Sequence, residues 1–172
     1  MVDVKYPTPE ILARPVKHFK LFYPSVEKLD FLADRFMNEY LYCSDEGRTP
    51  QLIWAAMFRY FSGDPQYGFH LPYEIDDFDG VLIFKDILPG WKCDVTLKYW
   101  GGEKFSHGLV RSGRELLKKA VDWYGLIRMN TDTADEKIVK LAKLCGFVEE
   151  GKRELDFRWN GRYYDRYILG WR

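Results

Sequence analysis

The strongest constraint on the fold is a hydrophobic period that changes repeatedly along the second half of the chain. Two β-rich runs, GVLIFKDIL and KCDVTLKYW, are separated by Pro89-Gly90 and predict an antiparallel hairpin. A helical pattern follows over residues 106–125, then a short strand over 126–129 and an amphipathic helix over 135–145. Strands that alternate with helices in this way predict a sheet with helices packed on its faces.

A second hairpin is predicted at the end of the sequence. Gly146 is expected to stop the preceding helix, and two β-rich runs follow over about 147–158 and 163–170. These runs meet across Asn160-Gly161, a dipeptide that favours the tight turn of a hairpin. The sheet is therefore expected to end with two antiparallel strands.

The first half of the sequence predicts two helices between strands. Residues 16–23 have the character of an edge strand, and a helix is expected over 25–40. Thr49-Pro50 suits the start of a buried helix, and another strand is expected after Tyr67. The whole order predicts an α/β (α+β) three-layer domain with a mixed, mostly antiparallel sheet of six to seven strands and about four helices.

Length and composition are consistent with a single domain over residues 1–172, with an extended arm over the proline-rich residues 1–15. Lysine plus arginine and aspartate plus glutamate balance at 26 each, which argues against nucleic acid as a partner. The start of the sequence has no signal-peptide pattern, and no apolar run approaches the roughly 20 residues that cross a membrane. We therefore expect a cytoplasmic protein without membrane contact.

Cysteines and aromatic residues suggest two further features. The three cysteines, Cys43, Cys93 and Cys145, are odd in number and lack the spacing of a metal site, so free buried thiols and no metal are expected. Aromatic residues make up 17% of the chain, more than a core of this size needs. Some are expected to line a groove or a homodimer contact, and the candidates for the contact are Trp159, Tyr163, Tyr164 and Trp171.

A glycine- and arginine-rich stretch before the third helix is a candidate phosphate site. Gly108, Arg111, Gly113 and Arg114 are expected to form a loop that the chain enters through Gly101-Gly102. Amide groups at a helix start bind phosphate, glycines allow close approach, and arginines add charge-assisted hydrogen bonds. The alternative is an ordinary helix start with arginines on its surface.

The C-terminal part of the chain carries a recognisable set of residues, namely Leu144, Gly146, Phe147, Glu150, Gly151, Arg153, Gly161, Arg162, Asp165, Tyr167, Leu169 and Gly170. With this set, the chain resembles the GNAT superfamily of N-acetyltransferases, and within it the Rim-type branch and the acetyltransferase-like proteins of phages. The resemblance covers residues 80–172 well and the first 80 only through the order of elements.

The resemblance implies a GNAT-like fold with splayed central strands and acetyl-CoA, a co-substrate, bound between them. The cofactor would lie where the strand ending near Trp100 parts from the strand starting near Leu126, with its pyrophosphate on the glycine- and arginine-rich stretch. The implied cofactor-binding residues are Trp100, Gly108, Leu109, Val110, Arg111, Ser112, Gly113, Arg114 and Asp135.

The sequence departs from the family pattern at several positions. Gly108 stands at the family's Gln/Arg position, Arg111 replaces its first glycine, and Asp135 stands where an asparagine is common. Ala142 occupies the position of the tyrosine that many members use as general acid, so no acid carries over.

The activity implied is acetyl transfer to an amine, either a protein N-terminus or a small molecule. Asp94, on the strand that leads to the split, is the candidate base, with Glu103 and Tyr99 as comparable candidates. The alternative for Asp94 is a surface carboxylate that faces solvent and has no catalytic role. The alternative for the whole chain is a CoA-binding or protein-interaction module that keeps the fold without turnover.

Overall fold

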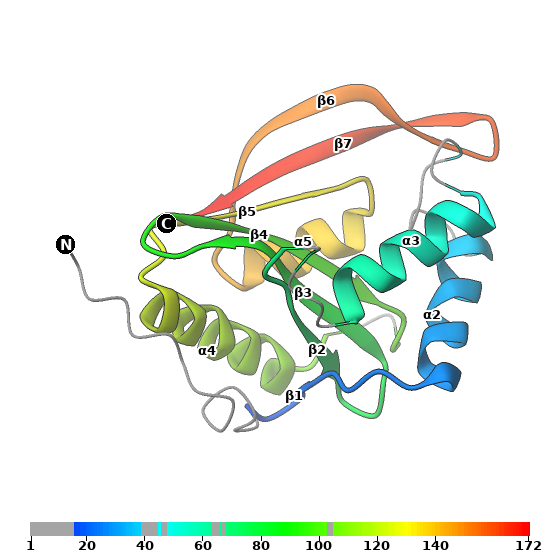
Figure 1. Cartoon of the computed structure of the whole chain (residues 1–172). Helices are drawn as coiled ribbons and strands as arrows, with labels where there is room; N and C mark the ends of the chain where they lie inside the picture. Colours follow the sequence, from blue (N-terminus) through cyan, green and yellow to red (C-terminus); the bar gives the residue numbers. More distant parts are fainter. Residues whose placement is uncertain (1–15, 39–44, 46–47, 63–65, 67, 103–104) are drawn as a thin grey trace.

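The computed structural model describes residues 16–38, 45, 48–62, 66, 68–102 and 105–172. Over these residues the chain forms one seven-stranded sheet in the order β1-β2-β3-β4-β5-β7-β6, with four helices (Figure 1). The elements are β1 (Phe19–Leu21), α2 (Val26–Asn38), α3 (Pro50–Phe61), β2 (Leu71–Ile75), β3 (Gly80–Leu88), β4 (Lys92–Tyr99), α4 (His107–Tyr124), β5 (Arg128–Thr133), α5 (Glu136–Leu144), β6 (Val148–Trp159) and β7 (Arg162–Trp171).

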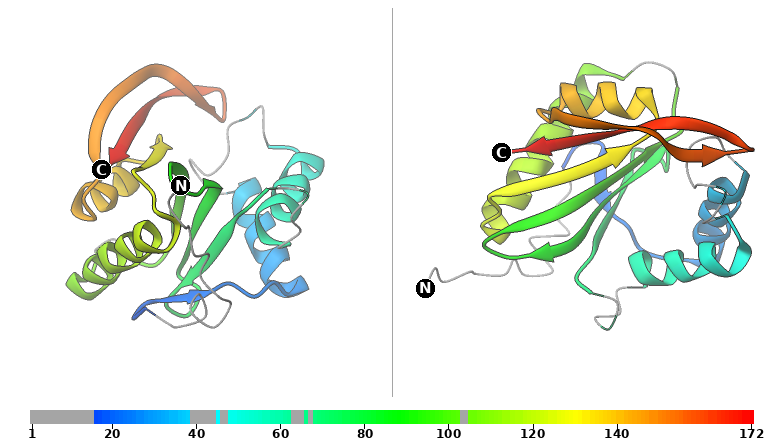
Figure 2. Two further views of the ribbon diagram at one scale, coloured as in Figure 1. Left: turned by 60° about the vertical axis from the view of Figure 1, so that its left-hand side comes forward. Right: turned by 90° about the horizontal axis from the view of Figure 1, so that it is seen from above.

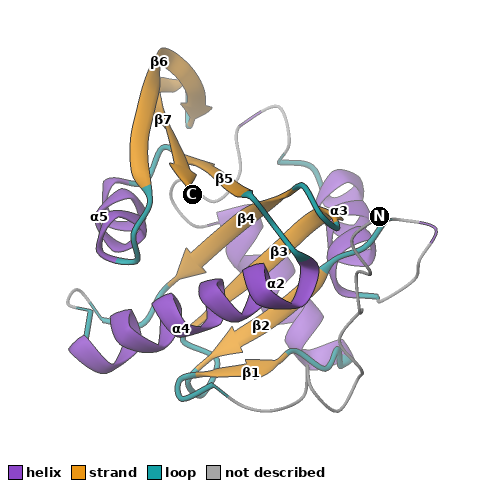
Figure 3. Ribbon diagram, turned by 90° about the vertical axis from the view of Figure 1, so that its left-hand side faces the viewer, coloured by secondary structure: helices purple, strands orange, loops and turns teal. Residues whose placement is uncertain are grey.

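The helices cover the two faces of the sheet, α4 and α5 on one and α2 and α3 on the other (Figure 3). Strand β3 shows how one strand supplies both cores, because its successive side chains point to opposite faces. Leu82 and Phe84 belong to the core under α4 and α5, whereas Val81 and Ile83 belong to the core under α2 and α3. The predicted three-layer α/β class, with its mostly antiparallel sheet, is confirmed.

The helix ends follow the local signals of the sequence. The Thr49 hydroxyl accepts a hydrogen bond from the Leu52 amide at 3.3 Å, and Pro50 begins α3. At the C-terminal end of a different helix, α4, Gly125 adopts φ 62°, a left-handed conformation that glycine takes without steric cost. These predicted boundaries are confirmed, while the expected arm over 1–15 lies outside the described residues.

Two predicted strands have different bounds. The strand expected over 16–23 is limited to Phe19–Leu21, because His18 with φ 71° turns the chain just before it. The strand expected over 126–129 instead runs from Arg128 to Thr133. Its buried positions beyond Met129 are threonines, so its second half carries no apolar alternation from which it could have been predicted.

Strands β4 and β5 are parallel neighbours that separate after three residue pairs. The pairs are Lys92 with Arg128, Cys93 with Met129 and Asp94 with Asn130. Beyond them, β4 stays paired to β3 through Tyr99, and β5 stays paired to β7 through Thr133. The edges that face each other across this split therefore belong to extended strands paired on their other side only.

The long β6–β7 hairpin extends from the sheet toward the side where α2 and α3 lie (Figure 2). At its tip, the amides of Asn160 and Gly161 each donate to the Asp45 carboxylate at 2.9 Å. Arg48 donates to the Asn160 side chain at 2.8 Å and lies over the Trp159 ring at 4.2 Å. We call these contacts the Asp45 latch.

The Asp45 latch changes the expectation for the aromatic tail. Trp159 is 4% exposed and lies within its own chain, so its ring is not available to a second subunit. Tyr163 is 58% exposed and remains compatible with such a contact. Within the part of the chain that the structure describes, no helix has the length and apolar character needed to cross a membrane.

Asp45→Asn should loosen the hairpin tip. The Gly161 amide, together with Asn160, Arg48 and Arg158, holds the Asp45 pKa below its ordinary value despite the opposing effect of burial. A lowered folded-state pKa gives stabilisation that is present above the ordinary value and lost as pH falls through the folded-state value. The protection factors of the Asn160 and Gly161 amides, taken relative to the intrinsic exchange rate at the same pH, should therefore fall in the variant at pH 6, and in the wild type below pH ~4.

Asp34→Asn is the matched control for this measurement, because Asp34 is an exposed carboxylate of α2 that bonds Asn38 at 2.7 Å, away from the hairpin. It should leave exchange at the tip unchanged. Equal protection of the tip in wild type and Asp45→Asn would show that the latch does not hold the hairpin.

Candidate functional site

The split between β4 and β5 has a different cavity on each face of the sheet. On the side of α4 and α5, a small apolar cavity of about 30 Å³ lies under the split. Its lining includes Val95 and Leu97 of β4, Thr131 of β5, and Ala142 and Cys145 of the α5 region. This side therefore presents an apolar surface beside the two free strand edges.

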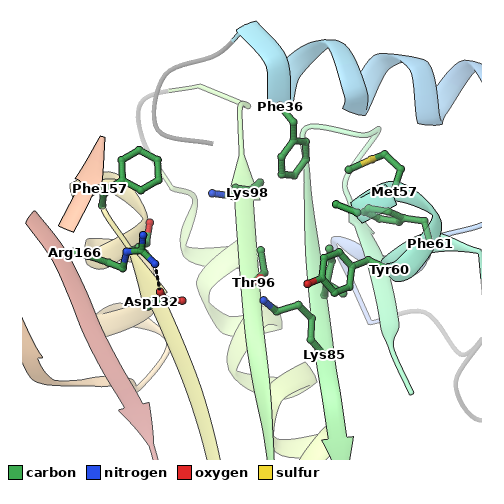
Figure 4. A pocket seen from close by; sticks show the side chains of 14 residues that line it. Phe36, Met57, Tyr60, Phe61, Lys85, Thr96, Lys98, Asp132, Phe157 and Arg166 are labelled. Atoms are coloured by element: carbon green, nitrogen blue, oxygen red, sulfur yellow. Dashed lines mark hydrogen bonds and ion pairs between the residues drawn. The ribbon is translucent and has the colours of Figure 1, made fainter. Parts of the chain in front are cut away.

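On the side of α2 and α3, a pocket of about 200 Å³ opens over the same split. Tyr60, Lys85, Thr96 and Lys98 point into it from α3, β3 and β4 (Figure 4). We call it the polar pocket. Side chains at alternate positions of β4 point to the same face, which is why Thr96 and Lys98 share this side while Val95 and Leu97 line the apolar cavity.

Tyr60 brings a proton donor into the polar pocket. Burial is the main cause that raises its pKa; the carboxylates of Asp86 and Asp94 raise it further, and Arg59 opposes them. The Lys85 ammonium lies 5.4 Å from the centre of the Tyr60 ring. The phenol is therefore protonated at neutral pH and can donate a hydrogen bond to a bound molecule.

Asp94 lies at the point where the split begins. It forms the last residue pair of β4 with β5, and its carboxylate accepts a hydrogen bond from the side-chain amide of Asn130 (Nδ2) at 3.2 Å. The alternation of β4 puts Asp94 on the same face as Thr96, and its cross-strand partner is Lys85. The candidate base predicted from the sequence thus stands at the inner end of the split, on the side of the polar pocket.

The other two candidate bases are placed differently. Tyr99 is buried on the opposite face, where its ring packs against Phe105 at 5.4 Å. Glu103 lies outside the described residues.

The glycine- and arginine-rich stretch is the start of α4, so the helical pattern predicted over residues 106–125 is confirmed and the expectation of a loop over residues 108–114 is wrong. Ser106 caps α4 by accepting the Leu109 amide at 3.0 Å, and the helix begins at His107. The reason is the apolar stripe of α4, which already includes Leu109 and packs on the sheet from the first turn. Because a cap satisfies one of the unpaired first-turn amides, those of His107 and Gly108 remain without a partner inside the helix.

Gly108 lets a histidine ring lie against the start of α4. A Cβ at this position would come within 2.8 Å of the His18 Nε2 atom. The ring is held from its other side, where Nδ1 lies 2.6 Å from the Asp76 carboxylate. The helix start is therefore bordered by an oriented imidazole on the β1 side.

The remaining residues of the stretch point in different directions. Ser112 and Gly113 are buried, with Gly113 facing Phe19 and Cys145. Arg111 is exposed on the second turn, whereas the Arg114 Nε donates to the Leu144 carbonyl at 2.7 Å and so supports the end of α5. The residues whose role stays a prediction are Gly108, Leu109, Val110, Arg111, Ser112, Gly113 and Arg114.

Trp100 and Asp135 already make contacts within the protein. The Trp100 indole donates to the Phe78 carbonyl at 2.6 Å and packs with Phe31 and Arg35 below α2. The Asp135 carboxylate accepts the Lys137 amide at 2.8 Å and is the N-cap of α5. Both residues flank the split. Their contact with a cofactor stays a prediction.

Lys137 is a residue of the site that the sequence did not indicate. From the first turn of α5 its ammonium donates to the Gly102 carbonyl at 2.6 Å and reaches the Gly101 carbonyl at 3.5 Å. It also lies over the Tyr99 ring, 4.9 Å from its centre. Lys137 thus connects α5 to the end of β4 across the open end of the split.

Cys93 and Cys145 are free thiols, as expected, and both are protonated at neutral pH. Burial raises the pKa of Cys93 to about 12, and burial raises the pKa of Cys145 to about 11 although Arg114 opposes it. Cys43 lies outside the described residues. Among the described residues, no group of three or more histidines, cysteines or carboxylates is arranged to hold a metal.

No protein-family model and no curated protein sequence matches this chain. Solved structures do match. They include the spermidine N-acetyltransferase of Vibrio cholerae in complex with CoA and spermine, at TM-score 0.61 and 19% identity over 89% of this chain and 94% of that one. The microcin C7 self-immunity acetyltransferase in complex with acetyl-CoA and AMP matches at TM-score 0.63 and 15% identity, over 93% and 98%.

A third match is the ribosomal-protein-S5-alanine acetyltransferase of Vibrio fischeri, at TM-score 0.59 and 15% identity over 91% of this chain and 93% of that one. At such identities the likeness establishes a shared fold. The chain therefore has the GNAT-like fold of acetyltransferases, as the sequence predicted.

The buried thiol of Cys93 and the partly buried thiol of Cys145 should react slowly with iodoacetamide at pH 8. Only the thiolate reacts, and each unit by which a pKa rises removes about nine-tenths of it. Peptide mapping should show labelling of Cys145 about 100-fold slower than in the urea-unfolded protein, and of Cys93 slower still. Rapid labelling of either residue in the folded protein would contradict its burial and would make it a candidate acyl-carrying nucleophile.

Proposed function

We propose that this chain is an acetyl-CoA-dependent N-acetyltransferase, acting through a single domain over residues 1–172. The observation that carries the proposal is the split between β4 and β5, which has an apolar cavity on one face and the polar pocket on the other. Free edges over Val95–Tyr99 and Thr131–Thr133 can hydrogen-bond an amide chain as an added strand would. The acetyl group of acetyl-CoA on one face and the acceptor amine on the other would then meet in the gap between β4 and β5.

The residues around the split fit the parts of acetyl-CoA. Unpartnered first-turn amides of α4 suit a diphosphate, and the exposed Arg111 adds a charge-assisted donor. Ala142 contributes only a methyl group to the apolar cavity, beside which the thioester would lie. The proposed cofactor-binding residues are Trp100, Gly108, Leu109, Val110, Arg111, Ser112, Gly113, Arg114 and Asp135.

The chemistry that this chain contributes is proton transfer and positioning. Acetyl-CoA, when bound, supplies the acetyl group as a thioester. Asp94 accepts the proton that the acceptor's ammonium must lose before nitrogen can attack, with the Asn130 amide fixing the carboxylate. A free backbone amide on an edge of the split can stabilise the oxyanion. The protonated Tyr60 phenol holds the acceptor in the polar pocket.

A second candidate function is a CoA-binding or protein-interaction module without turnover. Two observations favour it: Ala142 offers no hydroxyl in the apolar cavity, and Lys137 spans the open end of the split. Thermal stabilisation by acetyl-CoA without CoA release over a panel of amines and N-terminal peptides would support this module. The same panel of substrates distinguishes a protein N-terminus, the acceptor of the Rim-type branch, from a small amine. A homodimer stays a prediction, carried by the exposed Tyr163.

Acetyl-CoA at 100 times its dissociation constant should stabilise the wild-type protein by about 2.7 kcal/mol. The double variant Arg111→Ala/Arg114→Ala should lose this shift. Of the single variants, Arg111→Ala should account for most of the loss, because the Arg114 Nε is bonded to the Leu144 carbonyl. Lys118→Ala, an exposed cation farther along α4, is the matched control. An undiminished thermal shift in the double variant would show that the diphosphate does not bind at the start of α4.

Asp94→Asn should lower kcat by about 10²–10⁴-fold, the usual contribution of a general base, while the thermal shift with acetyl-CoA stays unchanged. Asn keeps the shape of the side chain and its contact with Asn130 but cannot take up the proton. Asp86→Asn, a carboxylate of β3 that pairs with Arg59 at 3.3 Å, is the control and should keep wild-type kcat. Wild-type turnover by Asp94→Asn would assign the base to another group.

A further inference from the structure

The cations that line the polar pocket are engaged within the chain. Lys85 faces Asp94 across the strands, and its ammonium lies 5.4 Å from the centre of the Tyr60 ring. Lys98 has an interaction of its own within the chain as well. The third cation of the lining is Arg166 of β7.

Arg166 is held by carboxylates of the two strands on either side of it. Its guanidinium lies 3.1 Å from the Asp132 carboxylate of β5 and 2.9 Å from the Asp156 carboxylate of β6. A charged group on the acceptor would have to displace one of these contacts, and the side chain left behind would lose its partner. The charges around the pocket therefore disfavour an acceptor with a second charged group.

The walls of the polar pocket are apolar and stand on opposite sides of its polar floor. Thr96 and Lys98 of β4 belong to the floor, with Phe157 of β6 on one side of them and Phe36 of α2 on the other (Figure 4). Helix α3 completes the second wall with Ala56, Met57 and Phe61. An apolar group that enters this space removes its own surface and that of the walls from water, which is favourable in proportion to the apolar area.

The size and the place of the polar pocket limit this apolar group. The volume of the pocket is about 200 Å³. An apolar cavity of about 150 Å³ is enough to bind one benzene molecule. Thr96 is two residues from Asp94 on the same face of β4, about 7 Å along the strand. A short alkyl arm therefore connects an amine at Asp94 with one ring-sized group between the walls.

We propose that the acceptor is an amine that carries one uncharged apolar group of about the size of a benzene ring, which binds between Phe157 and the wall formed by Phe36 and α3. This substrate class deepens the proposed acetyltransferase function and rests on it. A polyamine is the opposite case, because its second ammonium would lose water between apolar walls. The polar pocket therefore disfavours the substrate type named for the Vibrio cholerae structure.

Binding of acetylated products tests the proposal without turnover. N-acetyl-phenethylamine is compared with N-ethylacetamide, which lacks the ring, and with N-acetyl-β-alanine and N-acetylspermidine, which carry a charge instead. Calorimetry on the full chain, with and without CoA, should show N-acetyl-phenethylamine binding about tenfold tighter or more than each of the other three. Equal binding of the four probes, or no measurable binding of N-acetyl-phenethylamine, would overturn the proposal.

Ala56→Leu should fill part of the space beside the α3 wall and lower the affinity for N-acetyl-phenethylamine about tenfold, because Ala56 lines the pocket. Ala55→Leu is the matched control. It makes the same substitution at the neighbouring position of the same helix, where the side chain is exposed and outside the lining, and it should leave the affinity unchanged. An affinity that survives in Ala56→Leu, or that falls equally in both variants, would show that the ring does not bind against α3.

Turnover separates this inference from the function beneath it. The free amines are phenethylamine, ethylamine, β-alanine and spermidine, and two amide-capped peptides that begin with Phe or Gly form the matching pair for a protein N-terminus. In at least one pair, the member with the ring should have a kcat/KM about tenfold or more above that of its partner, and the pair with the larger difference identifies the source of the amine.

The two proposals fail in different ways. Turnover that prefers ethylamine, β-alanine, spermidine or the peptide that begins with Gly would overturn the substrate class and keep the enzyme. Selective binding of N-acetyl-phenethylamine with no turnover of any amine would overturn the enzyme and keep the apolar site.

Discussion

The whole arrangement depends on one interruption in an otherwise continuous sheet, the parting of β4 from β5 after Asp94 and Asn130. Extended backbone with unpaired amides and carbonyls is costly to bury and attracts any chain that can complete it. Here each strand with a free edge is hydrogen-bonded along its other edge, β4 to β3 and β5 to β7. The interruption is therefore rigid, and it offers backbone hydrogen bonds at a place where the sheet can be crossed.

The alternation of β4 distributes two chemistries around this interruption. Cys93, Val95 and Leu97 face α4 and α5 and make that side apolar, whereas Asp94, Thr96 and Lys98 are on the polar side. A shift of one residue in the β3–β4 register would exchange these sets and leave a carboxylate and a lysine in the core. The register that places the functional groups is thus protected by the same burial energy that holds the fold together.

The sequence predicted the parts of the structure that are decided within a few residues. The helix start at Thr49-Pro50, the end of the helical pattern at residue 125 and the turn at Asn160-Gly161 all depend on local backbone chemistry, and each was found where expected. The second half of β5 was missed because its inward positions are threonines. Contacts between distant segments, such as the Asp45 latch and the bridge from Lys137 to Gly102, have no local pattern, since a surface lysine or aspartate reads the same whether or not a partner faces it.

The choice of acceptor likewise depends on side chains that only the fold brings together, so no local sequence pattern indicates it. The fold is shared with acetyltransferases at identities below 20%, so it is preserved under nearly complete replacement of the side chains. The split and the helix start beside it are set by backbone pairing and tolerate such replacement. The lining of the polar pocket comes from side chains of α2, α3 and the strands β3 to β7, whose exchange costs the sheet little as long as their size is kept. The side chains of this lining can therefore differ between chains of this fold without disturbing the split, and it is in this lining that the specificity of this chain should be sought.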